Sequence, residues 1–150
     1  MNDDSAILFF NNNVKYRLKG KKHVRETLRR IFSDFGYSLS FLNYIFCNDE
    51  FLYNMNMQVL KHDTLTDIIT FDYSEGGEIK GEAYISIDRL RDNAKTFKTS
   101  LYNEALRVII HGALHLVGLK DKSEREKDEM RRKEDYYLGV FFRNFITASS

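Results

Sequence analysis

The stretch that most limits how this chain can fold is an apolar helical pattern over residues 102–117, which ends at Gly118. Its apolar residues recur at the three- and four-residue spacing of a buried helix face: Leu106, Ile109, Ile110, Ala113, Leu114 and Val117. Such a face has to pack against another layer of structure. His111 and His115 lie on the same helix, where a buried imidazole needs a polar partner.

Strand-like and helix-like segments alternate along the rest of the chain. Apolar, aromatic and β-branched content predicts strands at 6–11, 40–48, 66–73 and 82–88. Helical spacing and start signals predict helices at 21–36, 48–60, 89–97 and 123–146, with Gly36 and Asp88 as caps. We expect a loop at 75–81, and a strand at 66–73 that is covered on both faces. This order favours a small, mostly parallel sheet of the α/β or α+β class, in a single domain over 1–150.

Composition excludes several classes of protein. The chain has 23 basic and 22 acidic residues, a net charge of +1, so a nucleic acid or membrane partner would need a local patch. Cys47 is the sole cysteine, which rules out an internal disulfide and a zinc site built largely of thiolates. Without a signal sequence or an apolar span of roughly 20 residues, we expect a soluble, cytoplasmic protein.

Residues 111–121, HGALHLVGLKD, have the spacing of a metal site. His111 and His115 are four residues apart in a helix, so both imidazoles can reach one ion. A left-handed Gly118 would end the helix and bring Asp121 toward that ion. Three protein ligands with an open fourth position are typical of catalytic zinc. The alternatives are ordinary helix histidines and, for Asp121, a turn residue or helix cap.

The pattern lacks one residue of the zinc proteases. In H-E-x-x-H the glutamate is the general base. Gly112 occupies that position in this chain, which disfavours peptide hydrolysis by that mechanism.

Three motifs occur in order along the chain: DTLTDIITF at 63–71, GEAYIS at 81–86 and HGALHLVG at 111–118. Together they resemble the YbeY family of metal-dependent endoribonucleases, and the resemblance covers most of 50–138. It implies cleavage of single-stranded RNA in ribosomal RNA maturation, near the 16S 3′ end, and ribosome quality control on the small subunit. It also implies an α+β fold, a mixed four-stranded sheet with helices on its faces and a central, metzincin-like metal helix. One zinc ion per chain would be held by His111, His115 and Asp121.

The chain departs from the family pattern at three positions. Asp121 replaces the usual third histidine, and a carboxylate is an acceptable zinc ligand. Leu60 replaces an arginine that engages RNA, and the neighbouring Lys61 offers charge without the two-pronged guanidinium. Leu65 replaces a proline in a turn.

The anionic ligand predicts a shifted pH–rate profile. Aspartate lowers the net charge of the metal centre by one relative to imidazole, so a bound water should be less acidified. We expect the basic limb of the profile to move to lower pH in the Asp121→His variant. A wild-type limb no higher than that of the variant would contradict this.

Other roles are assigned as follows. A water on the metal is expected to act with a general base that the sequence does not identify, for which Lys61 and Asp67 are candidates. A local basic patch for RNA is predicted from Lys61, Arg107, Lys120 and Lys122.

Three further features have a structural alternative. Thr66 could contact the substrate or belong to a structural turn, and His62 could reach the cleft or lie in an exposed loop. The alternating charges of 122–135 indicate a solvated helix face, and Met130 a core position.

Two other functions remain open from the sequence. One is a metal-dependent hydrolase of another substrate class, such as a peptidase. The other is a non-catalytic ribosome-assembly factor whose metal only stabilises the fold, which the loss of arginine at Leu60 favours.

Overall fold

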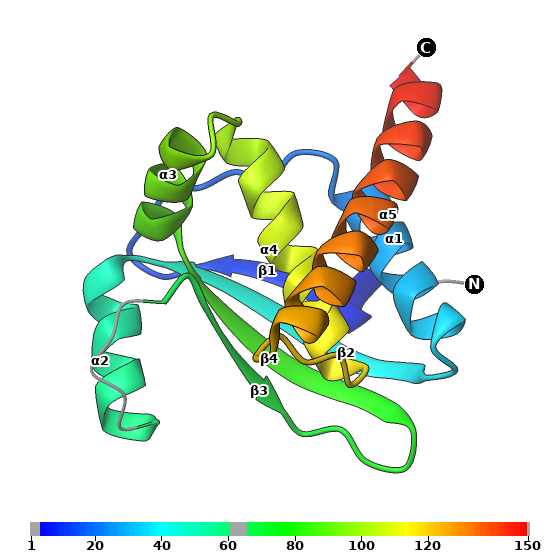
Figure 1. The fold of residues 1–150 in the computed structure, drawn as a ribbon, viewed down its shortest axis with the longest axis horizontal. Coiled ribbons are helices and arrows are strands. Elements are labelled where there is room, and N and C mark those ends of the chain that lie inside the picture. The colour runs from blue at the N-terminus through cyan, green and yellow to red at the C-terminus, as the bar shows by residue number, and fades with distance from the viewer. Residues whose placement is uncertain (1–3, 61–65, 150) are drawn as a thin grey trace.

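Four strands form one mixed sheet in the computed structural model, which describes residues 4–60 and 66–149 (Figure 1). The strands are β1 (Ile7–Asn11), β2 (Ser38–Cys47), β3 (Ile68–Asp72) and β4 (Glu78–Ser86), in the order β1-β2-β4-β3. The β1–β2 and β2–β4 pairs are parallel, and β3 runs antiparallel to β4 at one edge. The α+β class and the mostly parallel pairing predicted from the sequence are confirmed.

Helices cover both faces of this sheet. A short 3-10 turn (Asp4–Ala6) precedes β1, and the helices are α1 (Lys21–Asp34), α2 (Asp49–Val59), α3 (Ile87–Thr96), α4 (Leu101–Leu116) and α5 (Glu124–Ser149). α1, α4 and α5 bury the main core against one face, whereas α2 covers a smaller cluster around Cys47, Leu52 and Ile69 on the other. Phe46 belongs to the first core and Cys47 to the second, as strand alternation requires.

The apolar helix lies at the centre of the main core. In α4, Ala105, Ile109, Ala113 and Leu114 are fully buried, and the helix packs against α1, α3, α5 and the β3–β4 side of the sheet. The Tyr44 hydroxyl of β2 donates a hydrogen bond of 2.9 Å to the Ile109 carbonyl. The two histidines therefore stand on the most firmly held helix of the domain.

Three local predictions are wrong. Residues 78–81 belong to β4 rather than to a loop, because Ile79 is fully buried and Gly81 lets the Leu116 side chain approach closely. The N-cap of α3 is Ser86, whose side chain accepts from the Arg89 amide, while Asp88 accepts from the Asp49 amide. The strand at 66–73 shortens to β3, an edge strand with only Ile69 buried.

No helix in residues 4–60 and 66–149 combines the length and apolarity needed to cross a membrane.

Candidate metal centre

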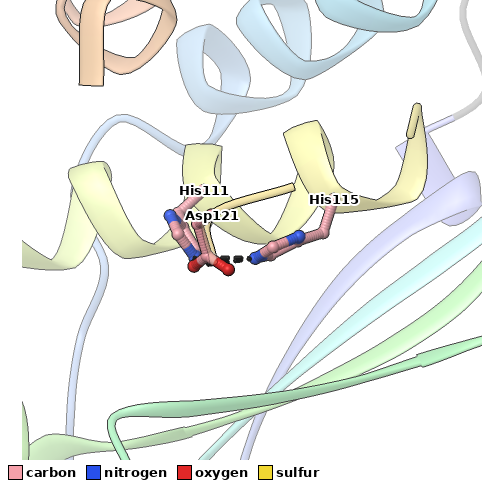
Figure 2. A group of neighbouring side chains, drawn as sticks. All are labelled: His111, His115 and Asp121. Atoms are coloured by element: carbon pink, nitrogen blue, oxygen red, sulfur yellow. Dashed lines mark hydrogen bonds and ion pairs between the residues drawn. The ribbon is translucent and has the colours of Figure 1, made fainter. Parts of the chain in front are cut away.

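His111 and His115 face one another from successive turns of α4 (Figure 2). Their ring centroids are 4.5 Å apart and the ring planes lie at 84°. The two Nε2 atoms are separated by 2.9 Å. The four-residue spacing thus does bring both imidazoles to a single point.

Asp121 reaches the same point because the chain turns back after α4. Gly118 has a φ of +102°, and the Leu119 amide donates to the Leu114 carbonyl at 3.0 Å, which closes the end of the helix in the manner of a glycine C-cap. The Asp121 Oδ2 atom lies 3.2 Å from the His111 Nε2 and 3.3 Å from the His115 Nε2. The three side chains predicted as ligands are therefore grouped together.

The outer nitrogen of each ring has a hydrogen-bond acceptor of its own. The His111 Nδ1 lies 2.7 Å from a Glu134 carboxylate oxygen, and the His115 Nδ1 lies 2.9 Å from the Leu119 carbonyl. Both partners accept hydrogen bonds, so each neutral ring carries its proton on Nδ1 and leaves Nε2 bare. Such bonds to the outer nitrogen orient the histidine ligands of metals.

This donor set fits a divalent metal ion. Two bare ring nitrogens and one carboxylate oxygen converge at 2.9–3.3 Å, a repulsive arrangement of lone pairs unless a cation lies between them. Two imidazoles and a carboxylate are among the ligand types of three-ligand catalytic zinc sites. Among the described residues, His111, His115 and Asp121 form the group whose possible ligand atoms lie close enough together to hold one metal ion.

Glu134 was missed by the sequence analysis. The predicted solvated face at 122–135 is wrong at this position, because Glu134 on α5 is buried and accepts from Arg107 at 2.9 Å as well as from His111. Burial by itself lowers the pKa of His111, but the hydrogen bond and charge of Glu134 outweigh it and raise that pKa. Helical spacing was the sign of its burial in the sequence, because Glu134 lies one helical turn after Met130. Met130 is buried as predicted.

The contact between Glu134 and His111 predicts a loss of metal affinity in the Glu134→Gln variant. The amide carries no charge to hold the Nδ1 proton, and disturbing such a partner costs roughly 10- to 100-fold in metal affinity. Competition with a chromophoric chelator measures this. The control is Asp135→Asn, since Asp135 also pairs with Arg107, at 2.7 Å, but is exposed. Equal affinities for wild type and Glu134→Gln would contradict the prediction.

A cavity of about 680 Å³ opens over the three ligands. Its wall is completed by β3, by Thr66 and Asp67 just before that strand, and by Leu60 and Lys122. Burial raises the pKa of Asp67, and the charge of His111 and two backbone amides oppose that effect. Asp67, a candidate general base, therefore lies beside the metal centre.

The predicted RNA-binding residues separate in the structure. Lys122 lines the cavity over the ligands, whereas Lys120 lines a different hollow beside Glu126 and Glu129. Arg107 is paired with Glu134 and Asp135. Lys61, which is also a candidate base, and His62 lie outside the described residues.

The position of Gly112 explains why no carboxylate follows the first histidine. Gly112 is buried where α4 meets β3, and a Cβ there would come 3.0 Å from the Ile68 Cδ1. A larger side chain here would have to push the Ile68 side chain aside where α4 packs on β3. The close packing at this point favours a small residue.

Two histidines of one helix and an aspartate from the turn after it face an open cavity at the edge of a mixed sheet. This arrangement defines a class of α+β proteins with a three-ligand metal site. The chain belongs to the endoribonuclease YbeY family, whose model matches residues 9–141.

Individual relatives match over almost their whole length. The chain is 46% identical to the endoribonuclease YbeY of Cytophaga hutchinsonii, covering 91% of this chain and 96% of that one. It is 42% identical to that of Flavobacterium johnsoniae, covering 90% and 97%. The solution structure of TM1509 from Thermotoga maritima aligns with a TM-score of 0.64 and 26% identity, covering 95% and 93%. The family resemblance predicted from the three motifs is confirmed.

Proposed function

We propose that this protein is a zinc-dependent endoribonuclease that cleaves single-stranded RNA, with ribosomal RNA near the 16S 3′ end of the small subunit as its substrate in the cytoplasm. The observation that carries the proposal is the convergence of His111 Nε2, His115 Nε2 and Asp121 Oδ2 on one point in the wall of an open cavity. The relatives named endoribonuclease YbeY support it.

The residues around the cavity have distinct tasks in this proposal. His111, His115 and Asp121 would hold a divalent metal ion, which would supply Lewis acidity toward a phosphoryl oxygen and lower the pKa of water. Glu134 and the Leu119 carbonyl hold the two imidazoles in the orientation that presents Nε2. Lys122 provides positive charge for a phosphate of the strand.

Asp67 is the residue we assign to proton transfer. It lies on the cavity wall beside the ligands, and burial brings its pKa above that of an exposed aspartate. A carboxylate in that place can take a proton from, or give one to, a group bound over the three side chains, as a general acid or base requires.

The rival functions differ in what they require of the site. A peptidase of the H-E-x-x-H type needs a carboxylate where this chain has the buried Gly112, which packs against Ile68, so that mechanism lacks its general base here. A non-catalytic assembly factor needs the metal for stability alone and gives no reason for an open cavity with Asp67 on its wall.

Cleavage of matched RNAs tests the proposal. A 16S 3′-end fragment is incubated with the purified protein as a single strand and as a duplex with its complement. We expect cleavage of the single strand, loss of cleavage with a chelator and recovery with Zn²⁺. A protein that binds ribosomal particles but cleaves neither form under any metal condition would support the assembly-factor function instead.

A further inference from the structure

A second cavity, of about 500 Å³, adjoins the first along α4. Its lining comes from the end of α3, the first half of α4 and α5. Asp67 lines both cavities. The two cavities therefore have Asp67 as a common wall.

Glu104 lines this cavity with its carboxylate. The residue is 6% exposed, and its side chain accepts no hydrogen bond from any residue in the part of the chain that the structure describes. Burial raises its pKa, while the charges of Arg107 and Arg131 oppose that effect. The Glu104 oxygens are not among the fully buried polar atoms without a partner, so they are open to the cavity and can accept hydrogen bonds from the N–H donors of a ligand there.

Phe97 and Arg131 stand at the rim of the same cavity. Phe97, which follows α3, is 60% exposed although it is a large aromatic residue. Arg131 is exposed and forms no ion pair within residues 4–60 and 66–149. An aromatic face beside a free guanidinium is the pair of groups with which proteins hold single-stranded nucleic acid.

We propose that the second cavity is a base-binding subsite that accepts one guanine of the substrate strand, beside the phosphodiester held at the metal centre. Phe97 stacks on the base, Glu104 accepts hydrogen bonds from its Watson–Crick edge, and Arg131 contacts a flanking phosphate. This inference rests on the proposed endoribonuclease function.

The chemistry of Glu104 selects guanine among the four bases. An ionised carboxylate accepts through two oxygens, and guanine presents two adjacent donors, N1–H and the 2-amino group. Uracil presents a single N–H between two carbonyls, which repel the carboxylate. Adenine and cytosine each offer one amino group next to a ring acceptor.

The spacing along α4 suits a neighbouring nucleotide. Glu104 and His111 are seven residues apart, which places them on the same side of the helix about 10 Å apart along its axis. The subsite would thus fix which bond of the strand lies over the metal centre.

Sequencing of selected RNA tests the subsite. A randomised pool of single-stranded oligoribonucleotides is incubated with wild type, Phe97→Ala, Glu104→Gln and the control Arg132→Ala, which is exposed on α5 and does not line the cavity. Bound and cleaved fractions are both sequenced. We expect wild type and Arg132→Ala to enrich guanine at one fixed position relative to the cut. Phe97→Ala should bind roughly five-fold or more weakly, the lower end of base–aromatic stacking, and Glu104→Gln should lose the guanine preference.

An inosine substitution separates recognition from folding. Inosine lacks the 2-amino group, so replacing the selected guanine should reduce wild-type cleavage and leave Glu104→Gln unaffected, a contrast that an unstable variant cannot produce. Cleavage with no base preference would overturn the subsite and leave the proposed function intact. If wild type cleaves none of the RNA, the subsite is tested on the sequences of the bound fraction. A bound fraction without guanine enrichment overturns the subsite as well.

Discussion

The His115→Ala variant is expected to lose both its metal and its RNA cleavage. His115 contributes one of three converging atoms, and its Nδ1 contacts only the Leu119 carbonyl among the described residues. Removing it leaves one imidazole and one carboxylate, too few to hold zinc in a catalytic site. Metal catalysis contributes several kcal/mol to such reactions, so the rate should fall on the order of 1,000-fold.

His115 is a better target than His111 for this experiment. His111 also pairs with Glu134 in the interface between α4 and α5, so its loss would leave a buried carboxylate with one partner fewer. His115 is partly exposed to the cavity. Metal content and initial cleavage rates are measured for wild type, His115→Ala and His23→Ala, a histidine of α1 remote from the ligands. A metal-loaded, active His115→Ala protein would show that the three-residue site is not the catalytic one.

The Asp67→Asn variant is expected to be slower but more stable. An asparagine cannot take or give a proton, and general acid–base catalysis contributes roughly 10²- to 10⁴-fold, so kcat should fall by that order while the metal is retained. Asp128→Asn, an exposed change on α5, is the control. Unchanged kcat in Asp67→Asn would exclude Asp67 from proton transfer.

The stability effect of this variant follows from the pKa of Asp67. Because burial raises that pKa in the folded protein, folding favours the protonated form. This contribution to stability is complete below the ordinary aspartate pKa of about 3.9 and is lost as the pH rises through the folded value. The asparagine of the variant does not titrate and has no such dependence. Denaturant unfolding of the metal-free proteins should therefore show Asp67→Asn gaining free energy of unfolding relative to wild type at neutral pH, with the difference shrinking as the pH falls toward the ordinary aspartate pKa.

The group of side chains able to hold a metal could be predicted from the sequence because its members are close together in it. His111, His115, Gly118 and Asp121 lie within one helix end and one turn, whose geometry follows from helical spacing and from the left-handed conformation of a glycine. The path of the backbone at this helix end brings the three side chains to one point. The family motif reinforced a pattern that local geometry already predicts.

Glu134 and Glu104 were not accessible in the same way. Glu134 reaches His111 only because α5 packs across α4, and in the sequence it is one charge among many in a charged run. Glu104 lies in the first turn of α4, where an acidic residue is favourable for the helix dipole alone. Contacts between elements that are distant along the chain decide both roles, and periodicity does not report such contacts.

The errors in the sheet have a similar cause. Gly81 and the polar residues beside it are typical of a turn, but pairing with β2 extends β4 back to Glu78. The apolar run at 68–71 favours a strand covered on both faces. In the structure β3 is the edge strand of the sheet, and its residues line the cavity over the three side chains. In the proposed function, this open edge is where the substrate reaches the three converging side chains.

Metal reconstitution tests the central claim most directly. Metal-free protein is titrated with Zn²⁺ while the cleavage rate of a single-stranded ribosomal RNA fragment is followed, with bound zinc measured by elemental analysis at each step. The three-ligand site predicts a rate that rises in proportion to bound zinc and levels off at about one zinc per chain, with no binding and no cleavage in the Asp121→Ala variant. Full cleavage by metal-free protein, or by Asp121→Ala, would contradict it.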